Sequence, residues 1–214
     1  MNKRPIYICF EGLDGSGKTT LFKKIVKKLK EEGFTLCEVS PTQKCGEHNL
    51  WENIYDKFKF LKDIIFFRNF LYAHRSNIVA KNIDWNVDLL IGDRSIITSF
   101  MCRWSKYELK NKKIIARVNF LESKIPTPDY AIYLDVTPEN LQKRLKSRGN
   151  TDIDETEKRS QEMRYAYDFL RNNPKAVSRI EKVKWLVIDG NPPEEEVFQN
   201  AWEEIISLLQ NVKK

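Results

Sequence analysis

The chain has 214 residues, of which 41% are hydrophobic and 31% are charged, and its formal net charge is +7. These values are ordinary for a soluble globular protein, and the length suits one α/β domain spanning residues 1–214, because no Pro/Gly/Ser-rich linker divides it. No apolar run approaches the ~20 residues that a membrane-spanning helix needs, and residues 1–5 lead directly into a predicted strand, so we expect a cytoplasmic protein without a membrane partner.

A short apolar strand and a glycine-rich loop come first in the chain. Ile6–Phe10 is almost wholly apolar, as a central strand covered on both faces would be. It feeds the segment Gly12-Leu-Asp-Gly-Ser-Gly-Lys-Thr-Thr20, which matches the pattern G-x-x-x-x-G-K-[ST]. An amphipathic run follows from Thr19 and ends at Gly33. Strand, loop and helix together are the context that this motif requires.

The residue types of the loop suit the binding of a polyphosphate. Gly12 and Gly17 let backbone N–H groups converge on phosphate oxygens, where a Cβ would block the approach. Lys18 can reach the β and γ phosphates, and the Thr19 hydroxyl can ligate Mg²⁺. The following helix directs its positive end at the same oxygens. We therefore predict a nucleoside triphosphate site formed by Gly12, Asp14, Gly15, Ser16, Gly17, Lys18, Thr19 and Thr20.

A second strand and a long apolar helix are predicted next. Residues 34–39 are typical of a strand, and residues 42–52 are polar and turn-like. An apolar-rich helix then runs from residue 55 to about residue 83, with hydrophobic positions on more than one side. Such a helix is either central in the domain or paired with a second copy of itself. We favour a homodimer interface around residues 58–83.

Strands alternate with helices in the rest of the chain. Strands are predicted at residues 87–91, 130–135 and 185–188, and helices at residues 96–104, 111–124, from Pro138 onward, 155–171 and 193–212. The alternation predicts a three-layer α/β/α P-loop NTPase fold with a five-stranded parallel sheet and right-handed crossovers. Binding groups should then gather at the carboxyl ends of the strands.

Neither the cysteines nor the basic charge predicts a further site. Cys9 and Cys37 lie in apolar runs, where a thiol behaves as a small hydrophobic group. Cys45 with His48 would be only half of a zinc site, and no second pair completes it. The lysines fall mostly on predicted helical faces, without interleaved aromatic residues. We expect small-molecule nucleotides, not nucleic acid, as partners.

Several charged residues suit phosphoryl transfer to a small acceptor, and the chain lacks the Asn-Lys-x-Asp motif that reads guanine in GTPases. Arg75 on the long helix and Arg94 after the third strand can clamp an acceptor phosphate, because a guanidinium matches phosphate oxygens bidentately. Asp93 can hold Mg²⁺ through water, with Glu11 as a candidate partner.

A basic cluster follows the helix that starts at Pro138. Arg144, Lys146 and Arg148 precede Gly149, and together they are candidates for a lid at about residues 144–156 that closes over the triphosphate. An ordinary basic helix end, favoured by the helix dipole, is the alternative interpretation.

Five stretches together resemble the thymidylate kinase family in order and spacing over nearly the whole chain. They are Phe10–Thr20, Ala73-x-Arg75, Asp93-Arg94, Pro128–Pro138 and Arg144-x-x-x-Arg148-Gly-x-x-Asp152. The resemblance implies a kinase of nucleotide biosynthesis that uses ATP and Mg²⁺ to convert a deoxynucleoside monophosphate, chiefly dTMP, to its diphosphate.

The resemblance also implies roles for single residues. Asp14 would contact the acceptor sugar, Arg75 and Arg94 its phosphate, and Arg144 the adenine side of ATP. Because Gly15 occurs in the loop together with lid arginines, the lid would supply the catalytic arginine, and Arg148 is the residue we choose for that role. The catalytic set would then be Lys18, Asp93, Arg94 and Arg148.

Departures from the family pattern lie around the base pocket and the lid. Leu71 occupies the place of the aromatic residue that stacks on thymine, so Phe70 and Leu71 are both candidates for contacting the base. Ser95 replaces the tyrosine that follows Asp-Arg, and Ile153 replaces an arginine of the lid.

Two other functions stay open. Asp93-Arg94-Ser95 also resembles the motif of deoxynucleoside kinases, which must activate a neutral 5′-hydroxyl and normally do so with a carboxylate at the end of the second strand. Ser40 stands there, so we prefer a monophosphate acceptor. The altered base pocket also fits a nucleotide-binding regulator without turnover.

Overall fold

Five parallel strands form the sheet of the described part of the chain. The computed structural model describes residues 4–42, 50–57, 65–102, 112–147 and 157–213. The strands are β1 (Ile6–Gly12), β2 (Leu36–Glu38), β3 (Leu89–Asp93), β4 (Tyr130–Asp135) and β5 (Lys184–Asp189). Their order across the sheet is β2-β3-β1-β4-β5, and all four neighbouring pairs are parallel. The predicted fold class is confirmed.

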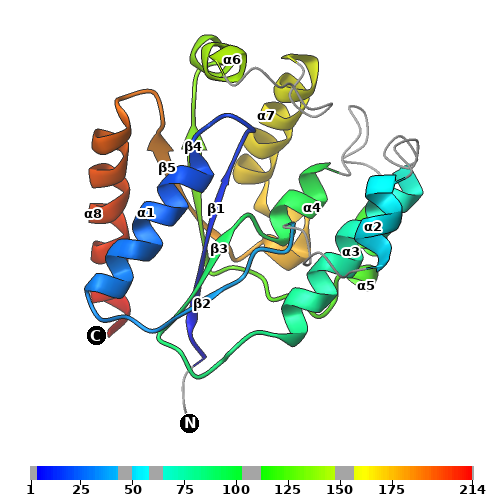
Figure 1. Cartoon of the computed structure of the whole chain (residues 1–214), viewed down its shortest axis with the longest axis horizontal. Helices are drawn as coiled ribbons and strands as arrows, with labels where there is room; N and C mark the ends of the chain where they lie inside the picture. Colours follow the sequence, from blue (N-terminus) through cyan, green and yellow to red (C-terminus); the bar gives the residue numbers. More distant parts are fainter. Residues whose placement is uncertain (1–3, 43–49, 58–64, 103–111, 148–156, 214) are drawn as a thin grey trace.

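Helices cover both faces of this sheet. They are α1 (Lys18–Glu31), α2 (Leu50–Lys57), α3 (Ile65–Lys81), α4 (Ile96–Cys102), α5 (Lys112–Leu121), α6 (Pro138–Ser147), α7 (Glu157–Asn172) and α8 (Glu194–Lys213), with 3-10 turns at Pro174–Ala176 and Ser178–Ile180. Figure 1 shows α1 and α8 on one face and α4 and α7 on the other, with α2, α3 and α5 farther out and α6 above the strand ends. None of the described helices is both long and apolar enough to cross a bilayer.

Each face of the sheet has its own hydrophobic core. Phe10 and Ile132 pack with Phe22 of α1 and Ala201 of α8 on one side. The other core includes Phe100 of α4 together with Tyr133, Tyr167 and Leu170. Because successive residues of a strand point to opposite faces, β1 contributes Phe10 to the first core and directs Glu11 toward α4 and α7.

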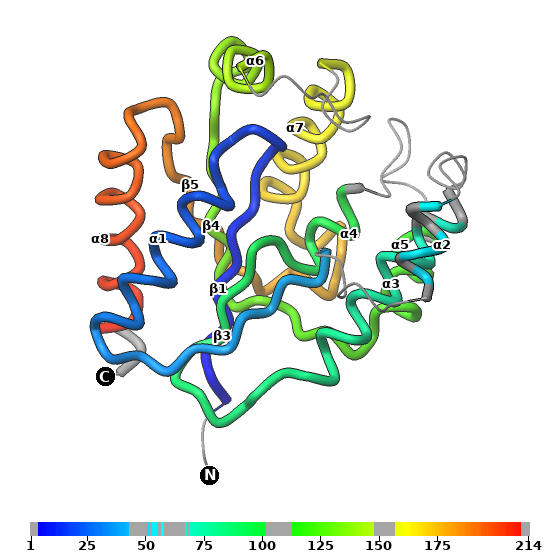
Figure 2. Tube along the Cα trace, viewed as in Figure 1, coloured from blue at the N-terminus to red at the C-terminus, as the bar shows by residue number. Residues whose placement is uncertain are grey.

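β1 lies where the chain changes direction across the sheet, with β3 on one side and β4 on the other. Phe10 pairs with Asp93, and Gly12 pairs with Leu134, so these strands end at the same edge. In Figure 2 the turn from β1 into α1 lies beneath α6 at this edge. Parallel sheets bind ligands at such switch points.

Most predicted boundaries differ from the observed ones by only a few residues. The strand predicted at residues 34–39 is reduced to Leu36–Glu38. It starts later because the Phe34 N–H donates to the Leu29 carbonyl near the end of α1, and the Thr35 N–H donates to the Asp88 carboxylate. β3 extends to Asp93 rather than ending at Ile91, because Asp93 pairs with Phe10.

The segment before α3 differs from the predicted turn. Residues 42–52 are polar on average, but α2 already begins at Leu50, where Trp51 offers an apolar side chain that packs against Phe70 of α3 with ring centroids 5.0 Å apart. The predicted helix over residues 55–83 corresponds to the end of α2 and to α3, and residues 58–64 between them lie outside the described residues.

Gly92 permits a close approach of β3 to its surroundings. A Cβ at this position would lie 2.5 Å from the Val39 carbonyl oxygen, 2.8 Å from the Arg94 carbonyl oxygen and 2.9 Å from the Tyr7 hydroxyl. Two of these neighbours are backbone atoms, which cannot rotate away. The glycine therefore fixes the distance between β3 and the segment after β2, immediately before Asp93 and Arg94.

We predict that Gly92→Ala lowers the free energy of unfolding by about 3 kcal/mol, because the methyl group overpacks rigid backbone. Gly33→Ala is the control. Gly33 has a φ of 86° but open space around it, so an alanine there would be strained only in its backbone, and the free energy of unfolding should fall by only about 1 kcal/mol. Urea unfolding of both variants measures the difference. An equal cost for the two would contradict the steric argument.

Candidate functional site

The loop between β1 and α1 has the backbone of a phosphate cradle. Gly12, Gly15 and Gly17 have positive φ angles of 148°, 85° and 93°, which side chains other than glycine rarely tolerate. The Ser16 N–H donates to the Leu13 carbonyl at 3.1 Å and closes the turn. The loop leads directly into the first turn of α1, whose unpaired N–H groups suit an anion.

Gly15 has a second role that the sequence does not reveal. A Cβ there would lie 2.8 Å from Cδ2 of Leu145 and 3.3 Å from Cδ1 of Leu141, both on α6. The bare backbone at Gly15 thus lets α6 pack directly on the loop.

Lys18 is buried and bridges two parts of its own loop. Its Nζ donates to the Leu13 carbonyl and to Oδ1 of Asp14, each at 3.2 Å. Burial, and to a smaller extent the nearby Arg94 cation, lower the pKa of Lys18 to about 8, although the carboxylates of Asp14 and Asp93 oppose the shift. The ammonium is thus held in a site that favours added negative charge.

Arg94, which directly follows β3, contacts the same Asp14 carboxylate. Its Nη2 forms a short hydrogen-bonded ion pair with Oδ1 of Asp14. Among the described residues, Arg94 alone has a positive φ without being glycine, at 71°, and its N–H donates to the Phe10 carbonyl at 2.9 Å. The backbone is therefore strained to direct this side chain, which is typical of functional sites. Asp14 thus joins Lys18 and Arg94 in one cluster.

Asp93 suits a metal ion. It is 6% exposed, and its Oδ1 has no hydrogen-bond partner among the described residues. Its backbone N–H donates to Oγ of Ser40 at 3.3 Å. A buried carboxylate oxygen without a donor suits a cation or its bound water. Thr19 and Thr20, at the start of α1, are exposed, so the Thr19 hydroxyl is accessible to a ligand.

Glu11 does not join Asp93. Its carboxylate accepts hydrogen bonds from Ser95, Thr98 and Tyr167, and burial raises its pKa despite these donors. The alternation of β1 explains this, because Glu11 faces α4 and α7 while Phe10 faces α1. The predicted partnership of Glu11 in metal binding is not supported. Among the described residues, no three His, Cys, Asp or Glu side chains gather into a group that could hold a metal ion.

A cavity of about 310 Å³ adjoins the loop on the α8 side. It is lined by Gly15, Ser16, Gly17, Thr20, Leu21, Lys24, Leu134, Arg144, Ser147, Gly190, Pro192, Glu194 and Val197. Arg144 donates to the Ser16 carbonyl at 3.0 Å and to the Gly190 carbonyl at 2.7 Å. The side chain predicted for the adenine side therefore forms part of the cavity wall, fixed to the loop and to the end of β5.

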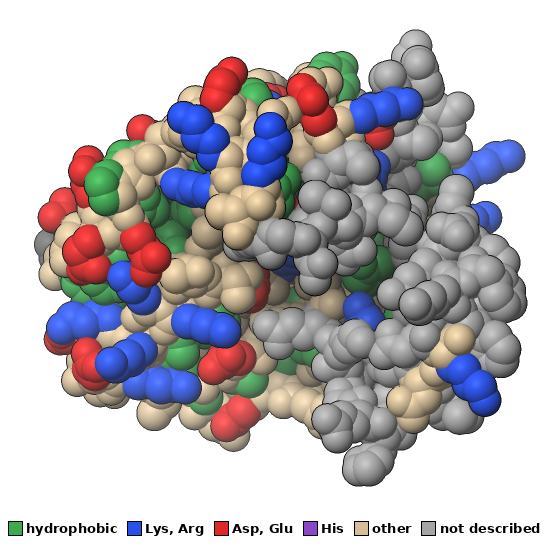
Figure 3. Space-filling model, turned by 45° about the horizontal axis from the view of Figure 1, so that its top comes forward, with side chains coloured by type: hydrophobic (Ala, Val, Ile, Leu, Met, Phe, Trp, Pro, Cys, Tyr) green, Lys and Arg blue, Asp and Glu red, His purple; other side chains and the backbone are tan. Residues whose placement is uncertain are grey.

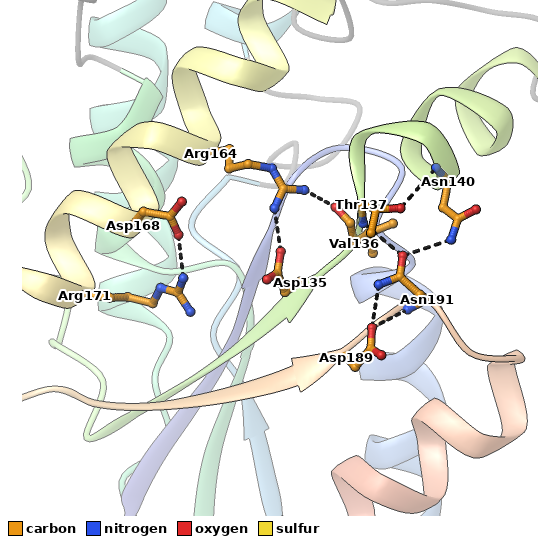
Figure 4. A network of polar contacts seen from close by, with 9 residues as sticks. All are labelled: Asp135, Val136, Thr137, Asn140, Arg164, Asp168, Arg171, Asp189 and Asn191. Atoms are coloured by element: carbon orange, nitrogen blue, oxygen red, sulfur yellow. Dashed lines mark hydrogen bonds and ion pairs between the residues drawn. The ribbon is translucent and has the colours of Figure 1, made fainter.

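The ends of β4 and β5 hold α6 and α7 through polar contacts that sequence reasoning missed (Figure 4). Arg164 of α7 pairs with Asp135 at 2.7 Å, and Asn191 accepts from the Thr137 N–H at 2.9 Å and from Asn140 at 3.0 Å. The sequence indicated only that a turn follows Asp189. These contacts fix the start of α6 beside the cavity.

The predicted acceptor residues Phe70, Leu71 and Arg75 all lie on α3. Arg75 is buried, donates to the Thr42 carbonyl at 3.0 Å and lies over the Tyr72 ring at 5.5 Å. Leu71 is buried one turn earlier on the same face. Phe70 is 37% exposed and packs against Trp51 and His74 instead.

The predicted lid spans about residues 144–156, and its residues 148–156, which include Arg148, lie outside the described residues, as do Cys45 and His48. Arg144 and Lys146, the other basic residues of the predicted lid, belong to α6.

We predict a pH dependence of stability that depends on Lys18. With a pKa near 8 in the folded chain against 10.5 in the unfolded chain, the unfolded state binds more protons between these values, so stability rises with pH in this window. Relative to Lys18→Met, the wild-type protein should gain about 3 kcal/mol of unfolding free energy between about pH 7 and pH 10.5. Urea unfolding at both pH values measures this gain.

The control for this measurement is Lys27→Met, which removes the charge of a highly exposed lysine from the same helix. Parallel profiles for wild-type protein and Lys18→Met would show that the Lys18 pKa is not lowered.

Several relatives match the chain over nearly their full length, and the three described here are each named thymidylate kinase. The protein of Leptospira interrogans is 30% identical over 225 residues, covering 99% of this chain and 98% of its own. The proteins of Caldicellulosiruptor saccharolyticus and Ureaplasma parvum are 29% and 26% identical, covering 95% and 99% of this chain and 97% and 94% of their own.

The family model described as thymidylate kinase matches residues 10–201, a span that begins at the end of β1 and includes the loop, Asp93, Arg94 and α6. The resemblance seen in the sequence is confirmed, and the chain belongs to the thymidylate kinase family.

Proposed function

We propose that this protein transfers the γ-phosphoryl group of ATP to the phosphate of a deoxynucleoside monophosphate, with dTMP as the preferred acceptor. The observation that carries the proposal is the Asp14 carboxylate, which holds the cation of the phosphate loop, Lys18, against the cation at the end of β3, Arg94. Two cations that share one carboxylate present adjacent positive charge to two anionic substrates. Phosphoryl transfer depends mainly on such positioning and electrostatics.

On the donor side, the main-chain N–H groups of residues 12–17 and the ammonium of Lys18 bind the triphosphate. The adenosine part of ATP enters the cavity beside the loop, where Arg144 borders the adenine. Because Arg144 is fixed by the Ser16 and Gly190 carbonyls, it contributes a rigid surface. Ser16 and Thr20 complete the donor site.

On the acceptor side, Arg94 and Arg75 bind the monophosphate, and Asp14 contacts the sugar. The base then lies along the face of α3 that carries Leu71 and Arg75, which are one helical turn apart. Phe70 is directed toward α2, so Leu71 is the better of the two predicted base contacts.

Mg²⁺ fits this site, because the free oxygen of Asp93 and the exposed hydroxyl of Thr19 are oxygen ligands of the kind it prefers. When bound, the ion offsets the negative charge of the phosphates. The chain's own residues orient it: the Ser40 hydroxyl accepts from the Asp93 N–H and fixes the backbone that carries the carboxylate.

Phosphorylation of a neutral nucleoside is the second candidate, and Ser40 argues against it. A general base for a 5′-hydroxyl would be expected after β2 beside Asp93, but Ser40 there is a hydroxyl that accepts from the Asp93 N–H. Glu38, the last residue of β2, pairs instead with Lys30 of α1 at 3.6 Å. An acceptor that is already anionic needs no such base.

The chain also offers a surface for a homodimer on α3. Phe67 and Phe70 are each 37% exposed there, and large apolar side chains on an outer helix suit a second copy. Figure 3 shows basic side chains interspersed with acidic ones over the described part of the nucleotide-binding face, which favours small nucleotides over nucleic acid. The cytoplasmic location stays a prediction of the sequence.

A coupled ADP-release assay with a panel of deoxynucleoside monophosphates and deoxynucleosides tests the proposal. We expect turnover with dTMP, weaker turnover with other monophosphates and none with thymidine. Lys18→Met should lower kcat/KM by ~10³ or more, because its charge stabilises the transferred group. Turnover with nucleosides alone would support the second candidate, and none with any acceptor would support a regulator.

Arg148→Ala should lower kcat by ~10³ with little change in the KM for dTMP, because an inserted arginine stabilises charge that develops only in the transition state. Lys146→Ala is the matched control. Lys146 is an exposed cation of α6 and precedes Arg148 by two residues in the sequence. Steady-state kinetics of both variants measure the effect. Equal losses would assign the role to basic charge in general rather than to Arg148.

A further inference from the structure

Two buried carboxylates lie outside the phosphate site and take no part in the proposed chemistry. Glu11 on β1 and Glu122 after α5 are both fully buried. A buried carboxylate is costly unless several donors satisfy it. What each one binds therefore indicates what it holds in place.

Glu11 is surrounded by hydroxyl groups of two helices. Oε1 accepts from Ser95 at 2.7 Å, and Oε2 accepts from Thr98 at 2.7 Å and from Tyr167 at 2.8 Å. Ser95 and Thr98 are three residues apart at the start of α4 and so lie on one face. Oγ of Ser95 also accepts from the Ile97 N–H at 3.1 Å, which caps the helix.

Glu122 is bound by hydroxyl groups as well. Its Oε2 accepts a short hydrogen bond from Ser76 of α3 and a bond of 2.9 Å from Ser99 of α4. Asn77, next to Ser76, donates to the Leu121 carbonyl at 3.0 Å. The carboxylate thus joins α3, α4 and the end of α5.

The order of these residues in the chain links both carboxylates to the acceptor site. Ser76 directly follows Arg75, and Ser95 directly follows Arg94. Thr98 and Ser99 are adjacent on α4, so this short helix contacts Glu11 and Glu122 through consecutive residues. Two buried groups of hydrogen bonds, joined through the adjacent residues Thr98 and Ser99, therefore link the residue after Arg94 to the residue after Arg75.

We propose that Glu11 and Glu122 are positioning residues, which fix the separation of Arg94 and Arg75 through the hydroxyl groups of α3 and α4 and thereby set the affinity for the acceptor phosphate. The proposal rests on the proposed function, in which both arginines bind that phosphate. Neither carboxylate touches substrate.

The backbone of Arg94 explains why such support is needed. With a φ of 71°, this residue is strained and persists only where its surroundings determine it. Its N–H is fixed by the Phe10 carbonyl, and the next residue, Ser95, is fixed by Glu11. Phe10 and Glu11 are themselves adjacent on β1, so the central strand holds both sides of the strained residue.

Thr98→Val and Ser76→Ala test the proposal, because each removes one hydroxyl donor without touching an arginine. We expect the KM and Kd for dTMP to rise about three- to tenfold in each variant, while the KM for ATP changes less than about twofold. Thr98→Ser keeps the hydroxyl and should restore the dTMP values. Steady-state kinetics, dTMP titration and thermal unfolding supply the measurements.

Tyr167→Phe is the matched control. It removes a donor to the same carboxylate, but from α7, which carries neither arginine. We expect it to lower the midpoint of thermal unfolding and to leave the dTMP values within about twofold of wild type. If Tyr167→Phe weakened dTMP binding as much as Thr98→Val, or if Thr98→Val and Ser76→Ala changed only the unfolding midpoint, the network would be merely structural.

Wild-type turnover separates this proposal from the proposed function. Turnover of dTMP by the wild-type protein with unchanged dTMP values in Thr98→Val and Ser76→Ala would overturn the positioning role alone. An absence of wild-type dTMP binding and turnover would overturn both proposals.

Discussion

The charge cluster of Asp14, Lys18 and Arg94 is the interaction on which the site depends. Two cations close together in a buried place repel each other. Burial is the main cause of the lowered pKa of Lys18, and the Arg94 cation adds to it. One carboxylate offsets the repulsion by contacting both. The loop is therefore already organised around negative charge. A bound phosphate adds to an existing field instead of creating one, which reduces the reorganisation that transfer requires.

The sheet brings these three residues together from separate parts of the chain. β1 carries the loop with Asp14 and Lys18, and β3 beside it delivers Arg94 because Phe10 and Asp93 are paired in register. Gly92 keeps β3 close to the segment after β2, and the left-handed backbone of Arg94 directs its side chain back across the edge. The residues predicted for the donor and the acceptor, Lys18 and Arg94, thus meet at the topological switch point, as expected for a parallel sheet.

The sequence predicts the elements better than it predicts the contacts between them. The loop, the parallel order and the grouping of Asp93 and Arg94 at a strand end follow from motif and periodicity, which are local properties. The partners of Glu11 could not be found this way, because Ser95, Thr98 and Tyr167 come together only when α4 and α7 pack on β1. Arg144 shows the same limit: a basic helix end is visible in the sequence, but its attachment to the Ser16 and Gly190 carbonyls is not.

The attachment of Arg144 to two carbonyl groups indicates which role this cation has in the site. A guanidinium that donates to two carbonyls of the cavity wall is committed to shaping the donor site, and it gains little by moving toward developing charge. Lys18 and Arg94 are likewise held by Asp14. Arg144 is therefore not the cation that meets the charge developing on the transferred group. The resemblance assigns that role to Arg148 of the predicted lid, acting beside the preorganised charges of Lys18 and Arg94.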